Sequence, residues 1–308
     1  MSVKNELNIN ANGGTELLER RLRSHLAGGL LEQFQIHCSR VREIDQSLKQ
    51  VFWAHDLPTD HEAFQALGEE RWESFDLIVF VSHWQQHMYQ AYLGVPIGAG
   101  VVIENGIEPI PTHVKPDNKI RLIYHSTPHR GLNILYSAFD HLCKTSDMHN
   151  VELNVFSSFD LYGWEQRDKP YEKLFEALDN HPQINYSKSV KNERIRGELQ
   201  RSHIHAYPSK WQETSCLCLI EAMMAGLICV HSSLGALPET SMGKTRMYQF
   251  TEDQNIHAAR FAEELDVAIK MVKLKNQYSH IVDNQTSNKY DFRFKALEWR
   301  KQLERILN

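Results

Sequence analysis

The sequence predicts an α/β fold made of two parallel β-sheets, each covered by helices on both faces. Nine short apolar runs of the kind that form strands are spread along the 308 residues. Amphipathic stretches long enough for helices separate most of these runs, which indicates βαβ units. A proline-containing segment at 107–119 interrupts the alternation and divides the chain into two halves.

Four strand-like runs make up the first half, at residues 34–39, 49–55, 76–82 and 100–107. Each run is rich in Val, Ile, Phe or Trp, which favour strands. The segment IEPIPTHVKPDNK at 107–119 then carries three prolines among polar residues, a composition typical of a linker. We therefore expect an N-terminal domain at residues 1–112.

Five further runs follow the linker, at residues 119–126, 151–158, 183–189, 203–209 and 227–233. Helical periods such as GLNILYSAFDHLCK and NERIRGELQR lie between them. They predict a C-terminal α/β domain at 119–289. The last segment, FRFKALEWRKQLERILN, predicts an amphipathic helix at about 290–308, which is expected to pack back on the N-terminal domain.

Composition excludes several classes of protein. The formal charge of −5 gives no basic field that would attract nucleic acid. No apolar run is long enough to cross a membrane, and residues 1–12 lack the apolar core of a signal peptide. The five cysteines suit buried free thiols in a reducing compartment better than a disulfide framework. We expect a cytoplasmic globular protein.

The stretch WQETSCLCLIEAMMAGLICV at 211–230 predicts a loop, an apolar helix and a buried strand. The loop follows the carboxyl end of the strand at 203–209, where ligands bind in doubly wound sheets. Either Thr214 or Ser215 could cap the helix, and the free backbone amides of its first turn suit a phosphate group. Glu213 lies at the edge of this turn.

Glu221 lies about two turns further along the same helix, among apolar residues. A buried carboxylate needs hydrogen-bond donors, and the vicinal diol of a ribose would supply two. The alternative interpretation is that Glu213 is solvated and that Glu221 faces a neighbouring Arg or Lys.

Several motifs occur together in one order along the chain: GGTE (13–16), WAHD (53–56), VSHW (81–84), ENGI (104–107), YHSTPHRGLNILYSAF (124–139), the two glutamates followed by Ala, Met and Gly, and SSLGALPE (232–239). This set resembles the retaining nucleotide-sugar glycosyltransferases of family 4 (group 1). The resemblance implies the GT-B fold, with two Rossmann-like, doubly wound domains facing a cleft. Residues 1–12 make a poor opening strand, so a reduced N-terminal domain is expected.

The resemblance also implies roles for residues of the second half. Arg130, just before Gly131 at a helix start, would clamp the donor diphosphate together with the amides of Ser215, Cys216 and Leu217. His125 and Ser126 occupy the place where the family usually has an Arg, and the family usually has a Lys where this chain has Arg130. Glu221 would hold the ribose, and Glu213 would orient the sugar.

In the first half, the resemblance makes His55 a catalytic candidate beside the donor sugar. Gly13, Gly14, Asn105 and Gly235, the last of these in the second half, would line the cleft. Each of these residues also has an ordinary structural interpretation, for example a turn at Asn105–Gly106 or a hydrogen bond between His55 and Asp56.

The resemblance implies a nucleoside-diphosphate sugar as donor, an acceptor of unknown identity and no bound metal cofactor. The histidine pairs His203/His205 and His83/His87 lack a third ligand at metal-binding spacing. Two other functions stay open: a non-catalytic nucleotide- or glycan-binding protein, and a nucleotide-sugar epimerase. Weak membrane association is also open, and RRLRSH at 20–25 is its nearest candidate, although a solvated helix face is the simpler interpretation.

Overall fold

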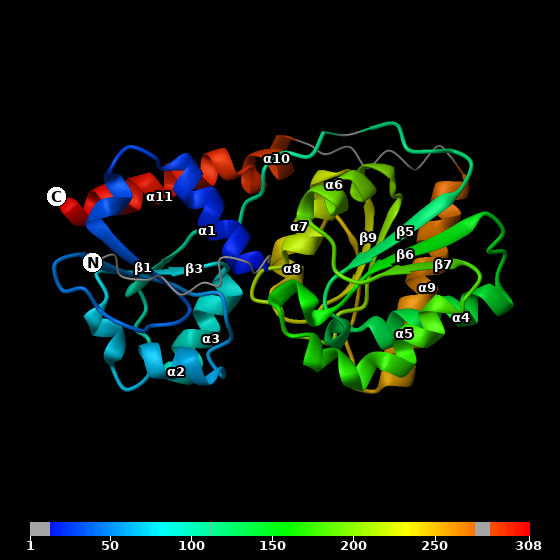
Figure 1. Cartoon of the computed structure of the whole chain (residues 1–308), viewed down its shortest axis with the longest axis horizontal. Coiled ribbons are helices and arrows are strands. Elements are labelled where there is room, and N and C mark those ends of the chain that lie inside the picture. Colours follow the sequence, from blue (N-terminus) through cyan, green and yellow to red (C-terminus); the bar gives the residue numbers. More distant parts are fainter. Residues whose placement is uncertain (1–12, 112, 275–283) are drawn as a thin grey trace. The chain divides into compact units, whose positions relative to one another are not determined.

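The structure, a computed structural model, describes residues 13–111, 113–274 and 284–308 (Figure 1). The chain divides into two compact units. Unit 1 comprises the residues up to Glu108 together with Asn288–Asn308, and unit 2 comprises Pro109–Ser287. The prediction for residues 1–12 lies outside the described residues.

Unit 1 is built on a parallel four-stranded sheet in the order β1-β2-β3-β4. Its strands are β1 (Phe34–Cys38), β2 (Lys49–Trp53), β3 (Leu77–Phe80) and β4 (Gly100–Val102). The helices α1 (Gly14–His25) and α11 (Phe292–Leu307) lie on one face, and α2 (His61–Leu67) and α3 (His83–Leu93) lie on the other (Figure 1). The four strands predicted for this half are confirmed, and each ends earlier than expected because the residues that follow it leave the sheet as a loop.

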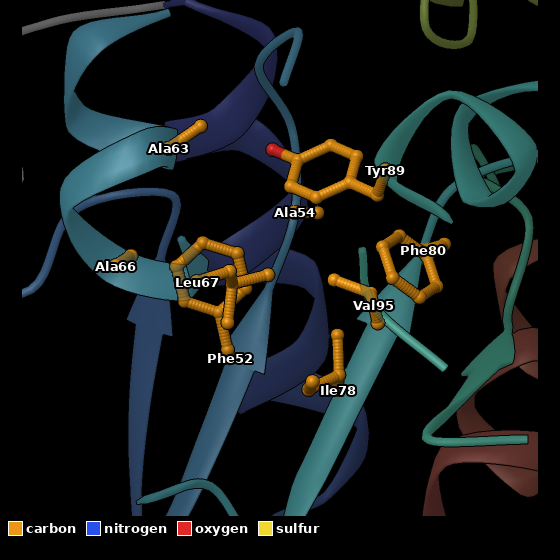
Figure 2. Packing of buried hydrophobic residues seen from close by; sticks show 9 residues of the cluster. All are labelled: Phe52, Ala54, Ala63, Ala66, Leu67, Ile78, Phe80, Tyr89 and Val95. Carbon is orange, nitrogen blue, oxygen red and sulfur yellow. The ribbon is translucent and has the colours of Figure 1, made fainter. Parts of the chain in front are cut away.

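The core beneath α2 and α3 shows why Val51–Trp53 of β2 and all four residues of β3 are apolar (Figure 2). Phe52 and Ala54 from β2 and the loop after it pack with Ile78 and Phe80 from β3 against Leu67 of α2. All five side chains are almost fully buried. Parallel strands covered on both faces bury alternate residues on each side, so polar alternation is lost.

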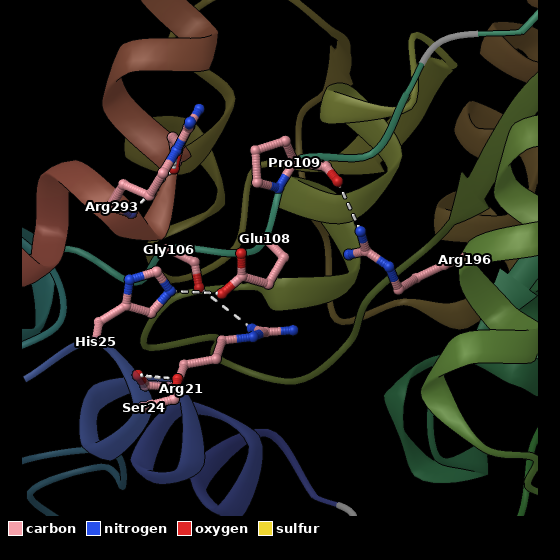
Figure 3. A network of polar contacts seen from close by, with 9 residues as sticks. Arg21, Ser24, His25, Gly106, Glu108, Pro109, Arg196 and Arg293 are labelled. Atoms are coloured by element: carbon pink, nitrogen blue, oxygen red, sulfur yellow. Dashed lines mark hydrogen bonds and ion pairs between the residues drawn. The ribbon is translucent and has the colours of Figure 1, made fainter. Parts of the chain in front are cut away.

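The segment that leaves β4 is held to α1 and to the start of α11 (Figure 3). Arg21 donates a hydrogen bond to the Gly106 carbonyl at 3.2 Å, and a His25 ring nitrogen lies 2.8 Å from the Glu108 carboxylate. Ile107 pairs with Asp291 as an isolated β-bridge. Two residues of the basic stretch at 20–25, Arg21 and His25, therefore make contacts within unit 1.

Unit 2 contains a parallel six-stranded sheet in the order β10-β9-β8-β5-β6-β7. Its strands are β5 (Ile120–His125), β6 (Val151–Phe156), β7 (Ile184–Ser187), β8 (Ile204–Tyr207), β9 (Ile228–Ser232) and β10 (Arg246–Tyr248). The first five are confirmed predictions. The sequence did not predict β10, because three residues beside polar neighbours give no apolar run.

Helices cover both faces of this sheet (Figure 1). One face carries α6 (Asn192–Arg201) and α7 (Leu217–Met224), and the other carries α4 (Leu132–Thr145), α5 (Glu172–Asp179) and α9 (Gln254–Lys273). The short helix α8 (Leu237–Ser241) follows β9, and α10 (Asn284–Tyr290) precedes α11. From β5 the sheet continues in one direction through β6 and β7, and in the other through β8, β9 and β10. The loops after β5 and β8 therefore lie at the switch point where doubly wound sheets bind ligands.

Candidate active site

Two loops approach each other closely at the carboxyl ends of β5 and β8. Gly131 caps α4 with a φ of +109°, a backbone conformation that residues with a side chain rarely adopt. A Cβ atom at Gly131 would lie 2.0 Å from the Pro208 carbonyl oxygen. Glycine is therefore required here, and it brings the preceding residue, Arg130, against the loop that carries Glu213.

Arg130 and Glu213 form a buried ion pair. Arg130 Nη1 lies 2.8 Å from both carboxylate oxygens of Glu213, and the Tyr207 hydroxyl donates to Glu213 Oε1 at 2.6 Å. The Glu213 side chain is 4% exposed and that of Arg130 is 25% exposed. The two residues are 83 positions apart, so the ion pair joins the β5 and β8 loops. The alternative of a solvated Glu213 is wrong.

The backbone of Glu213 is fixed as firmly as its side chain. It forms a β-bridge with Gly235, and the Ala236 amide donates to the Glu213 carbonyl at 2.7 Å. A Cβ atom at Gly235 would lie 2.6 Å from Glu213 N and O, so only glycine permits this approach. Gly235 thus lies against Glu213 within unit 2, and its predicted place in the cleft stays a prediction.

Burial raises the pKa of the Glu213 carboxyl, and the Arg130 guanidinium and the Tyr207 hydroxyl oppose that rise. For Arg130, burial favours the neutral form, but the Glu213 carboxylate, together with neighbouring Tyr and Cys side chains, raises the pKa of the guanidinium well above its ordinary value. The guanidinium therefore favours the ionised carboxyl and the carboxylate favours the charged guanidinium, so each group depends on the other.

Glu221 lies on α7 with two protein groups at its carboxylate. The Asn192 amide donates to Oε1 at 3.0 Å, and His125 Nε2 lies 3.5 Å from Oε2. Burial by itself would lower the pKa of His125, but the neighbouring Cys218 and the Glu221 carboxylate raise it. Neither group is the Arg or Lys that the alternative interpretation expected.

The helix that carries Glu221 begins later than predicted. It starts at Leu217 with Cys216 at the N-cap and no side-chain capping bond, so the expected caps Thr214 and Ser215 are wrong. Those two residues lie in the preceding bend. Cys216 is buried, and Cys218 Sγ donates to the His125 carbonyl at 2.9 Å, which ties α7 to the end of β5.

Unpartnered polar atoms collect around the ion pair. Among the described residues, no hydrogen-bond partner is found for His125 Nδ1, Thr127 Oγ1, Arg130 Nε or Ser157 Oγ. His125 ends β5, and Thr127 and Arg130 lie in the segment after it, which also includes the half-buried Ser126. Ser157 follows β6, the neighbouring strand. Buried polar groups are normally paired, so such a cluster indicates a site that a polar ligand completes.

The remaining predicted residues lie in unit 1. Gly13 caps α1, and Gly14 is its first residue. The amide of the half-buried His55 donates to Ser39 Oγ at 2.7 Å, and burial lowers the pKa of the His55 ring to about 3, so the imidazole is neutral near pH 7. Asn105 is 4% exposed, and its Oδ1 has no partner among the described residues.

Tyr207 and Asn192 are site residues that sequence reasoning missed. Tyr207 ends β8, and Asn192 begins α6 directly after the loop that follows β7. Both positions obey the rule that led to Glu213, since each follows or ends a strand at the carboxyl edge of the sheet. Applying that rule to every strand would have found them.

The family of the chain is decided by a match to the family model for glycosyl transferases group 1, which covers residues 107–284, more than half of the chain. The chain belongs to this family. It is a glycosyltransferase, and the predicted group 1 relationship is confirmed. A search of curated protein sequences finds no match to this glycosyltransferase.

Solved structures share the fold of this glycosyltransferase. A glycosyltransferase from Rickettsia africae ESF-5 matches with a TM-score of 0.70 and 13% identity, over 100% of this chain and 84% of that chain. Anabaena Alr3699/HepE, in complex with UDP and glucose, matches with a TM-score of 0.66 and 14% identity, over 83% and 72%. The pneumococcal O-GlcNAc transferase GtfA, in complex with UDP and GlcNAc, matches with a TM-score of 0.65 and 11% identity, over 85% and 53%. The predicted GT-B fold is confirmed.

The described part of the glycosyltransferase has neither a metal-ligand cluster nor a membrane-spanning helix. No group of three or more His, Cys, Asp or Glu side chains there could hold a metal ion. Within the same residues, no helix is both long and apolar enough to span a bilayer.

Proposed function

We propose that this protein is a retaining glycosyltransferase of family 4 that transfers a sugar from a nucleoside-diphosphate sugar without a bound metal. The observation that carries the proposal is the set of unpartnered buried polar atoms around Arg130, at the carboxyl ends of β5 and β6. Thr127, Ser157 and the Arg130 guanidinium can donate hydrogen bonds to anionic oxygens. A diphosphate matches this chemistry.

Arg130 would stabilise the leaving diphosphate. Its Nη1 already contacts Glu213, while its Nε–H is buried without a partner among the described residues. A guanidinium in a desolvated site stabilises developing negative charge more strongly than it would in water. The first turn of α7, which begins at Leu217, would add backbone amides in the manner of other phosphate-binding helices.

Glu221 and Glu213 would hold the two ends of the donor. A carboxylate accepts about four hydrogen bonds, so Glu221 can keep Asn192 and His125 and still accept from a ribose hydroxyl. Glu213, fixed by Arg130 and Tyr207, would orient the sugar next to the diphosphate. A rigidly held carboxylate loses little entropy when the substrate binds.

One observation favours a second candidate, a non-catalytic nucleotide-binding protein. Both glutamates already have protein partners, and a site that is satisfied internally has less need of substrate. This candidate predicts nucleotide binding without turnover.

The test is incubation with UDP-glucose and UDP-GlcNAc, chosen because two structures of similar fold were determined with UDP and these sugars. Release of UDP, followed by NMR with and without EDTA, reports transfer or hydrolysis. We expect Glu213→Gln to lower kcat by about 100-fold or more, and the exposed Glu263→Gln on α9 to have no effect.

Other outcomes distinguish the alternatives. Nucleotide binding without UDP release would favour the non-catalytic protein. Conversion of the donor sugar without UDP release would indicate an epimerase. A product with the opposite anomeric configuration to the donor would contradict the retaining mechanism, and loss of activity in EDTA would contradict metal independence.

A further inference from the structure

A cavity opens on unit 2 next to the Glu213 loop. Its volume is about 300 Å³, at the small end of the range for ligand pockets. The loops that follow β8, β9 and β10 form its walls. The side chains that matter for its chemistry are Lys210, Gln212, Leu234, Phe250, Thr251 and Glu252.

The cavity wall is continuous with the candidate active site. Gln212 directly precedes Glu213, and Leu234 directly precedes Gly235, the residue that forms a β-bridge with Glu213. A molecule seated in the cavity therefore lies next to the backbone that positions the catalytic candidate.

Polar side chains in the cavity are available for a ligand. Within the described residues, the Lys210 ammonium, the Gln212 amide and the Glu252 carboxylate make no hydrogen bond or ion pair, and all three residues are exposed. They offer both donors and acceptors. One cation and one anion cancel, so the cavity has no charge preference for a phosphate or another anion. Leu234 and Phe250 add an apolar surface to the same cavity.

Trp211 adds an exposed aromatic ring on the same loop, between two residues that line the cavity. It lies between Lys210 and Gln212 in the chain and is 43% exposed. Its ring meets the His129 ring edge-on, with centroids 5.0 Å apart at 86°. Burial lowers the pKa of His129 to about 4, so that ring is neutral near pH 7. The indole is thus supported from within unit 2 while much of it faces solvent.

The loops around the cavity are fixed before any ligand arrives. Ser209 Oγ accepts from the Trp211 amide at 3.2 Å, and Ser232 Oγ donates to the Ser209 carbonyl at 2.6 Å. On the opposite wall, the Phe250 amide donates to Ser233 Oγ at 3.0 Å. A preorganised site binds more tightly because less ordering is needed.

We propose that this cavity, together with the Trp211 indole, is a subsite for one sugar ring of a neutral glycan acceptor. A pyranose combines hydroxyl groups that need both donors and acceptors with a C–H face that packs on an aromatic ring. Lys210, Gln212 and Glu252 supply the polar groups. Phe250 supplies an aromatic ring inside the cavity, and Trp211 adds a second ring from its place between Lys210 and Gln212 in the chain. The inference rests on the proposed transferase function, because it assigns the acceptor to the glycan class.

The experiment measures glycan and nucleotide binding separately on the full chain. Wild-type protein is applied with UDP to a glycan array that covers hexose, N-acetylhexosamine, deoxyhexose and uronic acid linkages. The strongest neutral glycan is then titrated by tryptophan fluorescence. We expect Trp211→Ala and Gln212→Ala each to weaken glycan binding by about tenfold. The exposed Gln249→Ala, outside the cavity, is the matched control and should bind as wild type does.

The two proposals fail differently. If no glycan binds, or if neither Trp211→Ala nor Gln212→Ala weakens glycan binding, the proposed subsite is overturned. If only uronic acid glycans bind, its neutral specificity is overturned. If glycan binding has the expected sensitivity but UDP does not bind and no donor turns over, the subsite stands and the transferase proposal fails. Circular dichroism of each variant shows whether a loss of binding reflects unfolding.

Discussion

Replacing Arg130 with methionine tests whether the ion pair with Glu213 is as buried and as dependent on both partners as the geometry indicates. The Glu213 side chain is 4% exposed, and without Arg130 it retains the hydrogen bond that the Tyr207 hydroxyl donates at 2.6 Å. Removing one partner of a buried pair leaves an uncompensated charge and typically costs about 3–5 kcal/mol. We expect the free energy of unfolding to fall by that amount at pH 7.5.

The pH dependence makes this prediction specific. Burial raises the pKa of Glu213, and losing the guanidinium must raise it further. A carboxyl whose folded pKa exceeds its unfolded value is destabilising when ionised, so Arg130→Met should regain stability relative to wild type as the pH falls from 7.5 to 5. Each pH unit over which Glu213 takes up its proton recovers up to about 1.4 kcal/mol.

The assay is urea denaturation of wild type and variant at both pH values. The control is Arg246→Met, because Arg246 pairs with Glu264 at 2.6 Å but both side chains are about one-third exposed. Such a pair should contribute about 1 kcal/mol or less at either pH. If Arg130→Met lowers the free energy of unfolding by less than about 1 kcal/mol, or by the same amount at the two pH values, the reasoning is refuted.

Three further predictions concern the same framework. Gly131→Ala should lower the free energy of unfolding by at least about 3 kcal/mol, because it adds a clash with the Pro208 carbonyl to a positive φ. The control, Gly163→Ala, has a φ of +72° and no atom near its Cβ position, so it should cost only about 1 kcal/mol. Equal losses in urea denaturation would contradict this. Burial lowers the pKa of His231 and of His257 to about 4, so the unfolded chain takes up protons on these residues before the folded protein does. Each histidine therefore contributes stability above pH 6.5 that is lost as the pH falls, about 2 kcal/mol per residue between pH 7 and 5. His257→Gln should flatten that profile, and an unchanged slope would count against the assignment. Trp299→Ala should destabilise unit 1 by about 3–5 kcal/mol, because the indole is buried with its ring centroid 4.7 Å from that of Trp53. A loss of unfolding free energy under about 1 kcal/mol would be inconsistent with this packing.

The strands of both sheets could be predicted because their signal is local. The β2 run is apolar at Val51, Phe52 and Trp53, as expected for a strand covered on both faces. The short strand β10 could not be predicted, since Arg246–Tyr248 is held by its parallel pairing with β9 rather than by its own composition. The start of α7 was misplaced because Thr214 and Ser215 are good caps in isolation, while the β-bridge between Glu213 and Gly235 keeps the preceding chain extended.

The site was predictable in its positions but not in its pairings. Placing Glu213 and Arg130 at strand ends follows from the doubly wound pattern. That they bind each other does not, because the contact spans 83 residues and depends on the close approach permitted at Gly131. Asn192 was missed for a similar reason, since its contact with Glu221 joins α6 to α7.

The measurement that tests the proposed donor site most directly is a thermal-shift panel of nucleoside diphosphates and nucleotide sugars, with and without EDTA. A ligand at 100 times its Kd stabilises the folded protein by about 2.7 kcal/mol, which corresponds to a rise in Tm of roughly 5–10 °C for a domain of this size. We predict such a rise for one nucleotide class, unaffected by EDTA and absent in Glu221→Ala. No rise with any nucleotide in wild type, or the same rise in Glu221→Ala, would contradict the proposed donor site.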